Sequence, residues 1–184
     1  MRSLRHVAAI ALLVLVDGKV RAAEYPLQLE FAVSAETEIA QMTSTVVITI
    51  DRLMLPSRRT RAMDALAHTG YSGFLTLLRS LPPVGTIALG KRQVDVRYAH
   101  EEPRDSERRL VLVADRPLFF LGGADKSRAG YELTMVELIF DAKGGVTGTM
   151  AGAARVKPDR AGAPLLDDYA ERPVRLTNHI RPQP

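Results

Sequence analysis

Apolar and polar residues alternate with a period of two over much of the chain, which is the pattern of half-buried β-strands. The alternation is clear in residues 27–33, 46–50, 94–98 and 174–180. Two further runs, RLVLVA at 109–114 and VELIF at 136–140, are mostly apolar at consecutive positions. Such runs are typical of central strands that are covered on both faces. The pattern therefore predicts a sheet with wet outer faces and a buried centre.

Glycine-bearing turns separate these runs. Leu89-Gly90-Lys91 and the stretch 141–145 (DAKGG) each join two apolar runs closely enough to predict hairpins, because glycine supplies positive φ angles at low cost. The run that follows the second turn carries Gly148 and Gly152 on one parity. Small residues on one face of a strand predict that another stretch of backbone packs close against it.

A helical period interrupts the strands between residues 57 and 81. We expect one helix from an N-cap at Ser57 to a stop at Gly70, and a second that ends before Pro82-Pro83. The apolar positions that carry the helical spacing are Met63, Leu66, Ala67, Phe74, Leu77, Leu78 and Leu81.

These elements together predict an α+β domain that is predominantly antiparallel β. We expect about seven or eight strands in a curved sheet, partial barrel or sandwich, with a two-helix insert near 57–81. A helix-grip fold is the nearest alternative, but it needs a long C-terminal helix where the alternation predicts a strand. Residues 24–184 form one domain on this interpretation.

Residues 1–23 have the three-part design of a secretory signal peptide. A short positive end is followed by an apolar run of ten residues, 7–16, and by the small pair Ala22-Ala23. The run is too short for a stable membrane span, which needs about 20 residues. No later apolar run approaches that length, so we expect no membrane span in the mature chain. We predict an exported protein, in the periplasm or outside the cell.

Composition and charge exclude several classes of function. The formal net charge is +4 and the pI about 9.6, but residues 1–23 hold four Lys or Arg and one Asp. The remaining chain is therefore close to neutral, and a nucleic-acid partner is not expected. The chain has no cysteine, which excludes disulfides, thiolate metal sites and a thiol nucleophile. Phosphate-binding glycine loops, zinc-protease motifs and a complete nucleophile elbow are absent from the sequence, so we predict no catalytic residues, no cofactor and no metal.

Two strands carry candidate ligand-binding residues. His100 continues the parity of Val94, Val96 and Tyr98, which would place Tyr98 and His100 inward, lining a cleft or barrel mouth. With Asp115 or His179 the imidazole could hold a metal, whereas the alternative is a solvated strand end.

Glu137 is the second candidate. It shares the parity of Leu133, Met135 and Ile139, so an inward carboxylate with a shifted pKa is one interpretation. The other interpretation places Val136, Leu138 and Phe140 inside and Glu137 outside. Phe74, on the second predicted helix, completes the candidate ligand-binding set.

Arg58, Arg59 and Arg61 open the first predicted helix. Cations at a helix N-terminus oppose the helix dipole, so their clustering indicates an anion-binding site or a solvated helix end.

Several stretches resemble a family of uncharacterised exported bacterial proteins. They are 108–117 (RRLVLVADRP), 131–148 and 167–178 (DDYAERPVRLTN), and the resemblance covers nearly all of the mature chain. The resemblance implies bacterial export and assigns no activity, cofactor or catalytic residue.

On this basis the leading functional hypothesis is a non-enzymatic binding or envelope-associated module for a small apolar ligand or a protein partner. A hydrolase or metal-dependent enzyme with a non-standard site is one alternative, and a structural or interaction protein without a pocket is another. A cavity lined by Val94, Tyr98, Phe74 and Leu77 would favour ligand binding. A cluster of His100, Glu137 and Asp115 would favour an enzyme.

Overall fold

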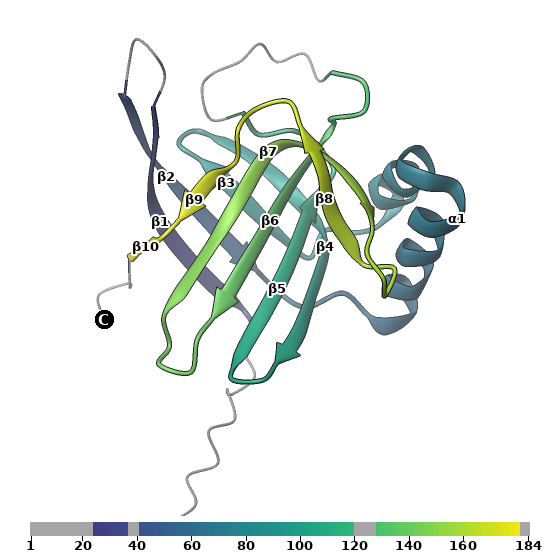
Figure 1. Ribbon diagram of the computed structural model, residues 1–184, viewed down its shortest axis with the longest axis horizontal. Helices are drawn as coiled ribbons and strands as arrows, with labels where there is room; N and C mark the ends of the chain where they lie inside the picture. Colours follow the sequence, from purple (N-terminus) through teal and green to yellow (C-terminus); the bar gives the residue numbers. More distant parts are fainter. Residues whose placement is uncertain (1–23, 37–40, 120–127, 181–184) are drawn as a thin grey trace, which may run out of the picture.

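The computed structural model describes residues 24–36, 41–119 and 128–180. The predicted signal peptide, 1–23, lies outside the described residues. The chain folds into a curled, antiparallel, barrel-like sheet with one helix packed on its outside (Figure 1). The strands are β1 (Leu27–Glu36), β2 (Gln41–Ile50), β3 (Gly85–Leu89), β4 (Arg92–Arg104), β5 (Glu107–Ala114), β6 (Leu133–Phe140), β7 (Val146–Pro158), β8 (Pro164–Tyr169), β9 (Val174–Leu176) and β10 (Asn178–Ile180), and the helix is α1 (Pro56–Ser80).

Neighbouring strands in the chain pair with one another from β1 to β8, always antiparallel. The C-terminal segment then joins the two sides of the sheet. Its first part, β9, pairs with β7, and its second part, β10, pairs with β1. This pairing is what curls the sheet round, and it confirms the strand that the alternation at 174–180 predicts.

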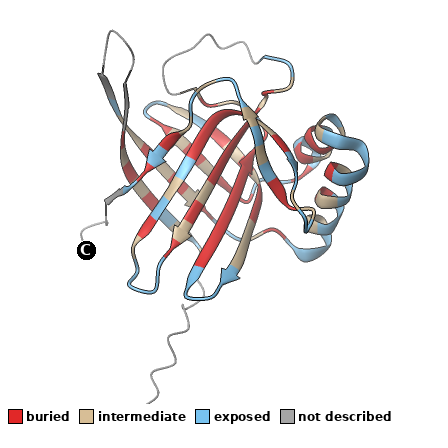
Figure 2. Ribbon diagram, viewed as in Figure 1, coloured by how far each residue is buried: buried red, intermediate tan, exposed pale blue. Residues whose placement is uncertain are grey.

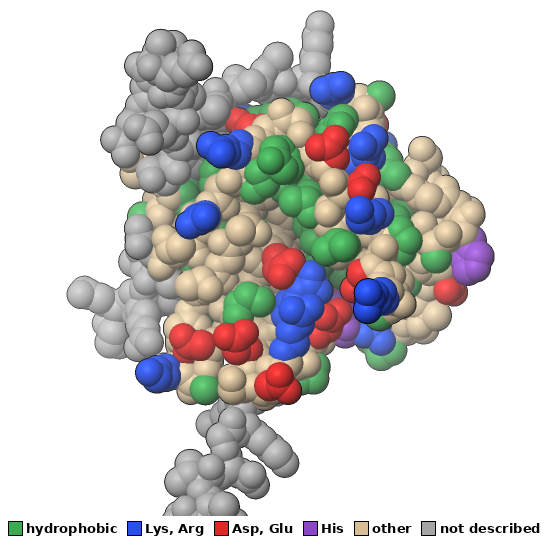
Figure 3. All heavy atoms as spheres, in the orientation of Figure 1, with side chains coloured by type: hydrophobic (Ala, Val, Ile, Leu, Met, Phe, Trp, Pro, Cys, Tyr) green, Lys and Arg blue, Asp and Glu red, His purple; other side chains and the backbone are tan. Residues whose placement is uncertain are grey.

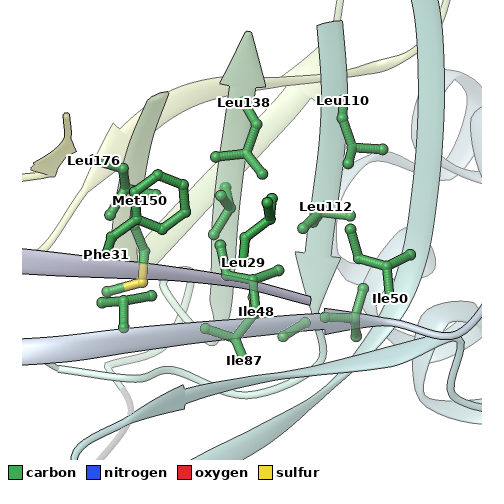
Figure 4. Packing of buried hydrophobic residues seen from close by; sticks show 14 of the residues in the cluster. Leu29, Phe31, Ile48, Ile50, Ile87, Leu110, Leu112, Leu138, Met150 and Leu176 are labelled. Atoms are coloured by element: carbon green, nitrogen blue, oxygen red, sulfur yellow. The ribbon is translucent and has the colours of Figure 1, made fainter. Parts of the chain in front are cut away.

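Apolar side chains fill the space inside the curled sheet. Figure 4 shows them converging from strands on opposite sides, including Phe31 of β1, Leu112 of β5 and Leu138 of β6. A side chain that lined a water-sized cavity would have accessible surface there, whereas the central members of this cluster have none. These members are Phe31, Ile48, Ile50, Ile87, Leu110, Leu112 and Leu138, each 0% exposed. The part of the interior that these residues form is therefore packed solid.

A second apolar layer lies between α1 and the outer face of the sheet. The helix packs against β4 and β7, and its inward side chains, among them Leu66, Phe74 and Leu78, are buried. Figure 2 shows the other side of α1 exposed to solvent, and strands β5 to β7 buried along most of their length. These strands are apolar at consecutive positions because they face the interior on one side and the helix layer on the other.

The expected pair of helices is wrong, because the segment is a single helix, α1, with a kink. Gly70 has φ 68° and ψ −165°, the one non-helical conformation inside the helix. Glycine reaches positive φ without a steric penalty, so the chain bends there instead of stopping. The N-cap is Leu55 and Pro56 occupies the first turn, so Ser57 is not the cap.

A β-bulge between Val96 and Tyr98 changes which face β4 presents. Val96 pairs with Ala114 and Tyr98 with Val113, so one extra residue is inserted in β4. Val96 belongs to the interior cluster, whereas Tyr98 belongs to the layer under α1. The expected inward parity of Tyr98 and His100 is therefore wrong.

Candidate functional site

The residues predicted to line one ligand cavity lie in different layers. Val94 is part of the interior cluster, whereas Tyr98 and Phe74 are fully buried between helix and sheet. Burial raises the pKa of the Tyr98 hydroxyl, and no described residue accepts a hydrogen bond from it. Phe74 and Tyr98 therefore act in packing the helix against the sheet.

His100 lies on the outer face of β4, opposite the first turn of α1. The guanidinium of Arg59 lies against its ring, with Nη1 2.5 Å from Nε2. The Oε1 atom of Glu102, on the same strand, lies 3.8 Å from Nε2 of His100. Burial and the Arg59 charge lower the pKa of His100, so at neutral pH the ring is neutral and accepts a hydrogen bond from Arg59. The contact between Arg59 and His100, with Glu102 beside it, holds the start of α1 against the sheet.

Glu137 also points outward, as the second of the two interpretations predicts, since Val136, Leu138 and Phe140 belong to the interior cluster. Its carboxylate accepts a hydrogen bond from Arg109 at 2.8 Å. This bond lowers the pKa of Glu137 and keeps it ionised. A carboxylate held in this state is poorly suited to donate a proton as a general acid.

Of the three residues whose clustering would favour an enzyme, His100 and Glu137 lie opposite Val111 on either side of β5, whereas Asp115 lies beyond the end of that strand. Asp115 pairs with Arg97 at 3.1 Å, whereas Glu137 pairs with Arg109. Within the described part of the chain, no three His, Asp or Glu side chains are placed to hold a metal ion. The side chain of His179 lies outside the described residues.

The Arg59–His100 contact predicts a pH dependence of stability. Besides Arg59 on α1, the charged groups that influence His100 are Glu101 and Glu102 of β4 and Arg109 of β5. The folded state resists protonation of His100 more than the unfolded state, whose pKa is about 6.5. The free energy of unfolding should therefore fall as the pH drops from 7 through that value.

Urea denaturation between about pH 7 and pH 5 measures this effect. The decline should be shallower for His100→Gln, and unchanged for His68→Gln, which alters an exposed histidine on α1. If the free energy of unfolding fell equally with pH in the wild type and in His100→Gln, the decline would not be due to His100.

A basic pocket lies at the end of the sheet where β4 begins and β5 ends. Its volume is about 520 Å³. Three arginines from separate parts of the chain line it: Arg79 in the last turn of α1, Arg92 at the start of β4 and Arg116 just after β5. We call this site the basic pocket; its other lining residues are Gln93, Val94, Pro117, Leu118 and Phe119.

The arginines of the basic pocket differ from those elsewhere in the described chain. Arg97, Arg108, Arg109 and Arg155 each pair with one or two carboxylates. Among the residues that the structure describes, no carboxylate lies within ion-pair distance of the three pocket arginines. On the face shown in Figure 3, by contrast, acidic and basic side chains lie next to one another. The basic pocket therefore concentrates positive charge that the described residues leave unbalanced.

One wall of the basic pocket, residues 117–119, is fixed by close packing against β7. The amide of Leu118 donates to the carbonyl of Gly152 at 2.6 Å. A Cβ at Gly152 would lie 2.1 Å from the Leu118 carbonyl oxygen, so only glycine allows this approach. The carbonyl of Phe119 in turn accepts a hydrogen bond from Arg92. The close backbone approach that the small residues of this strand predict is thus confirmed at Gly152.

The predicted anion site at the start of α1 has a different arrangement. Arg59 is engaged with His100, whereas Arg58 and Arg61 have no ion pair with a described carboxylate. Arg61 is exposed. Arg59 is therefore already engaged within the fold, whereas Arg79, Arg92 and Arg116 line one pocket.

The basic pocket was not predicted from the sequence, because its arginines are separated by more than ten residues from one another. Each taken alone resembles a solvated surface cation. The nearest signal is Arg116-Pro117 directly after a buried strand, since residues at strand ends often line sites.

The comparisons with known proteins provide no assignment. No protein-family model, no curated protein and no solved structure matches the chain. In the described part of the chain no helix has the length and apolar character needed to cross a bilayer.

Proposed function

We propose that this chain is an exported, non-enzymatic binding protein that takes a small organic anion in the basic pocket. The observation that carries the proposal is that Arg79, Arg92 and Arg116 line one pocket and have no carboxylate partner among the described residues. Guanidinium groups bind carboxylates and phosphates in a planar, two-point geometry. The pocket volume of about 520 Å³ is in the usual range for small-molecule sites.

The proposed ligand site lies at the end of the sheet, whereas the sequence led us to expect an apolar cavity. A small apolar ligand would need space inside the sheet, whereas the central interior side chains have no accessible surface. At the end of the sheet, the interior residues Val94 and Leu118 instead form an apolar base for a charged pocket. Export and bacterial origin rest on the sequence of residues 1–23 and on the resemblance.

Thermal unfolding with a panel of anions tests the proposed function. A ligand that binds only the folded state raises Tm. Phosphate, sulfate and small carboxylates should raise the Tm of the wild type to different extents. The combined variant Arg79→Gln/Arg92→Gln/Arg116→Gln should lose that response.

The matched control is Arg58→Gln/Arg61→Gln, which removes two arginines from the start of α1 and should keep the response. The proposal would be overturned by a full response in the triple variant. It would also be overturned if no anion raised the Tm of the wild type.

A further inference from the structure

The structure carries a more specific inference about the same pocket, which rests on the proposed function. We propose that the basic pocket selects a phosphate monoester that bears an apolar substituent. The phosphate lies among the three arginines, and the substituent covers Pro117 and Phe119.

The first argument is charge balance. The three arginines are cations, and no lining residue is acidic. A carboxylate brings one negative charge and two oxygens. A phosphate monoester brings a charge of about −1.5 to −2 at neutral pH and three acceptor oxygens. Three guanidiniums carried by three separate parts of the chain match the phosphate better than the carboxylate.

The second argument is the composition of the pocket away from the arginines. Val94 and Leu118 belong to the interior apolar cluster, and Pro117 and Phe119 extend that surface. Bare inorganic phosphate would leave the half-buried side chains of Pro117 and Phe119 facing water. A substituent with a short hydrocarbon chain would cover them, which is favourable in proportion to the apolar area removed from water.

The third argument is rigidity. Arg92 is held by its hydrogen bond to the carbonyl of Phe119, and Leu118 is held by Gly152. The carbonyl of Arg116 accepts a hydrogen bond from the buried hydroxyl of Thr134 at 2.9 Å. The backbone beside two of the three arginines is therefore fixed before a ligand arrives, which lowers the ordering cost of binding.

Isothermal titration calorimetry with three probes tests the inference: inorganic phosphate, hexyl phosphate and hexanoate. Hexyl phosphate should bind about tenfold or more tightly than either other probe, because it alone satisfies both halves of the pocket. Phe119→Ala should weaken the binding of hexyl phosphate and leave the binding of inorganic phosphate unchanged. Arg92→Gln should weaken both, and Arg61→Gln neither. Should Arg92→Gln fail to fold, Arg79→Gln at the exposed helix end replaces it.

The outcomes separate this inference from the proposed function. If inorganic phosphate binds in the pocket but hexyl phosphate binds no more tightly, or hexanoate binds equally well, the inference fails and the anion-binding function stands. If none of the three probes binds, both fail. A lipid and a soluble metabolite can share this chemistry, so vesicles of phosphatidic acid and of phosphatidylcholine distinguish them. Binding to phosphatidic acid vesicles but not to phosphatidylcholine vesicles assigns a lipid headgroup. Binding of hexyl phosphate without binding to either kind of vesicle assigns a soluble monoester.

Discussion

Replacing Phe74 by Ala should lower the free energy of unfolding by about 3 to 5 kcal/mol, the range found for removal of a large buried aromatic side chain. Phe74 is 0% exposed, in the layer between α1 and the outer face of the sheet. The kink at Gly70 lies one turn before it, so the second part of the helix depends on this contact for its position. Urea denaturation of the wild type and of Phe74→Ala measures the difference.

The control for this prediction is Leu55→Ala, at a leucine that is 56% exposed. It should change the free energy of unfolding by less than about 0.5 kcal/mol, as exposed substitutions usually do. The Phe74→Ala variant should unfold at a lower Tm, but phosphate should still raise that Tm. A small loss of stability together with loss of phosphate binding would instead make Phe74 a ligand contact and contradict its assignment to packing.

Replacing Gly152 by Ala should both destabilise the fold and damage the basic pocket. The added methyl group would lie 2.1 Å from the carbonyl oxygen of Leu118, which is backbone and cannot rotate away. Forcing extra volume into a packed site costs about 1 to 3 kcal/mol. Because residues 117–119 must move, we also expect phosphate binding to weaken.

Two measurements on the same sample, urea denaturation and phosphate titration, check this coupling. Thr147→Ala changes an exposed position on the same strand and should leave both unchanged. If Gly152→Ala lost stability but bound phosphate as the wild type does, the wall at 117–119 would not be part of the binding site.

Local patterns were sufficient for most of the strands. The alternation at 27–33 and 174–180 depends only on neighbouring residues, and it correctly predicts β1 and β9. The turn at 141–145 was predictable for the same reason, since Gly144 has φ 80° and Asp141 accepts hydrogen bonds from two following amides.

The features that the sequence did not reveal depend on residues far apart in the chain. The bulge between Val96 and Tyr98 depends on the pairing of β4 with β5. Because of this bulge, His100 lies on the outer face and not on the expected inner face. Whether Gly70 ends a helix or kinks it depends on what the following residues pack against. The basic pocket needs the end of α1, the start of β4 and the end of β5 to meet, and no local pattern records that meeting.

The burial of the central interior residues predicts that ligands do not bind inside the curled sheet. An apolar molecule inside the sheet would have to displace side chains that already touch on all sides. The arginines at the end of the sheet need no such rearrangement. We therefore propose that the ligand lies at the basic pocket, outside the packed core.

Two-dimensional NMR of uniformly ¹⁵N-labelled protein, titrated with hexyl phosphate, tests this claim most directly. We predict that the largest shifts are those of the backbone amides of 92–94 and 116, 118 and 119 and of the side-chain Nε–H groups of Arg79, Arg92 and Arg116. Largest shifts at Val136 and Leu138 in the core, or at Arg58, Arg59 and Arg61 at the start of α1, would contradict it.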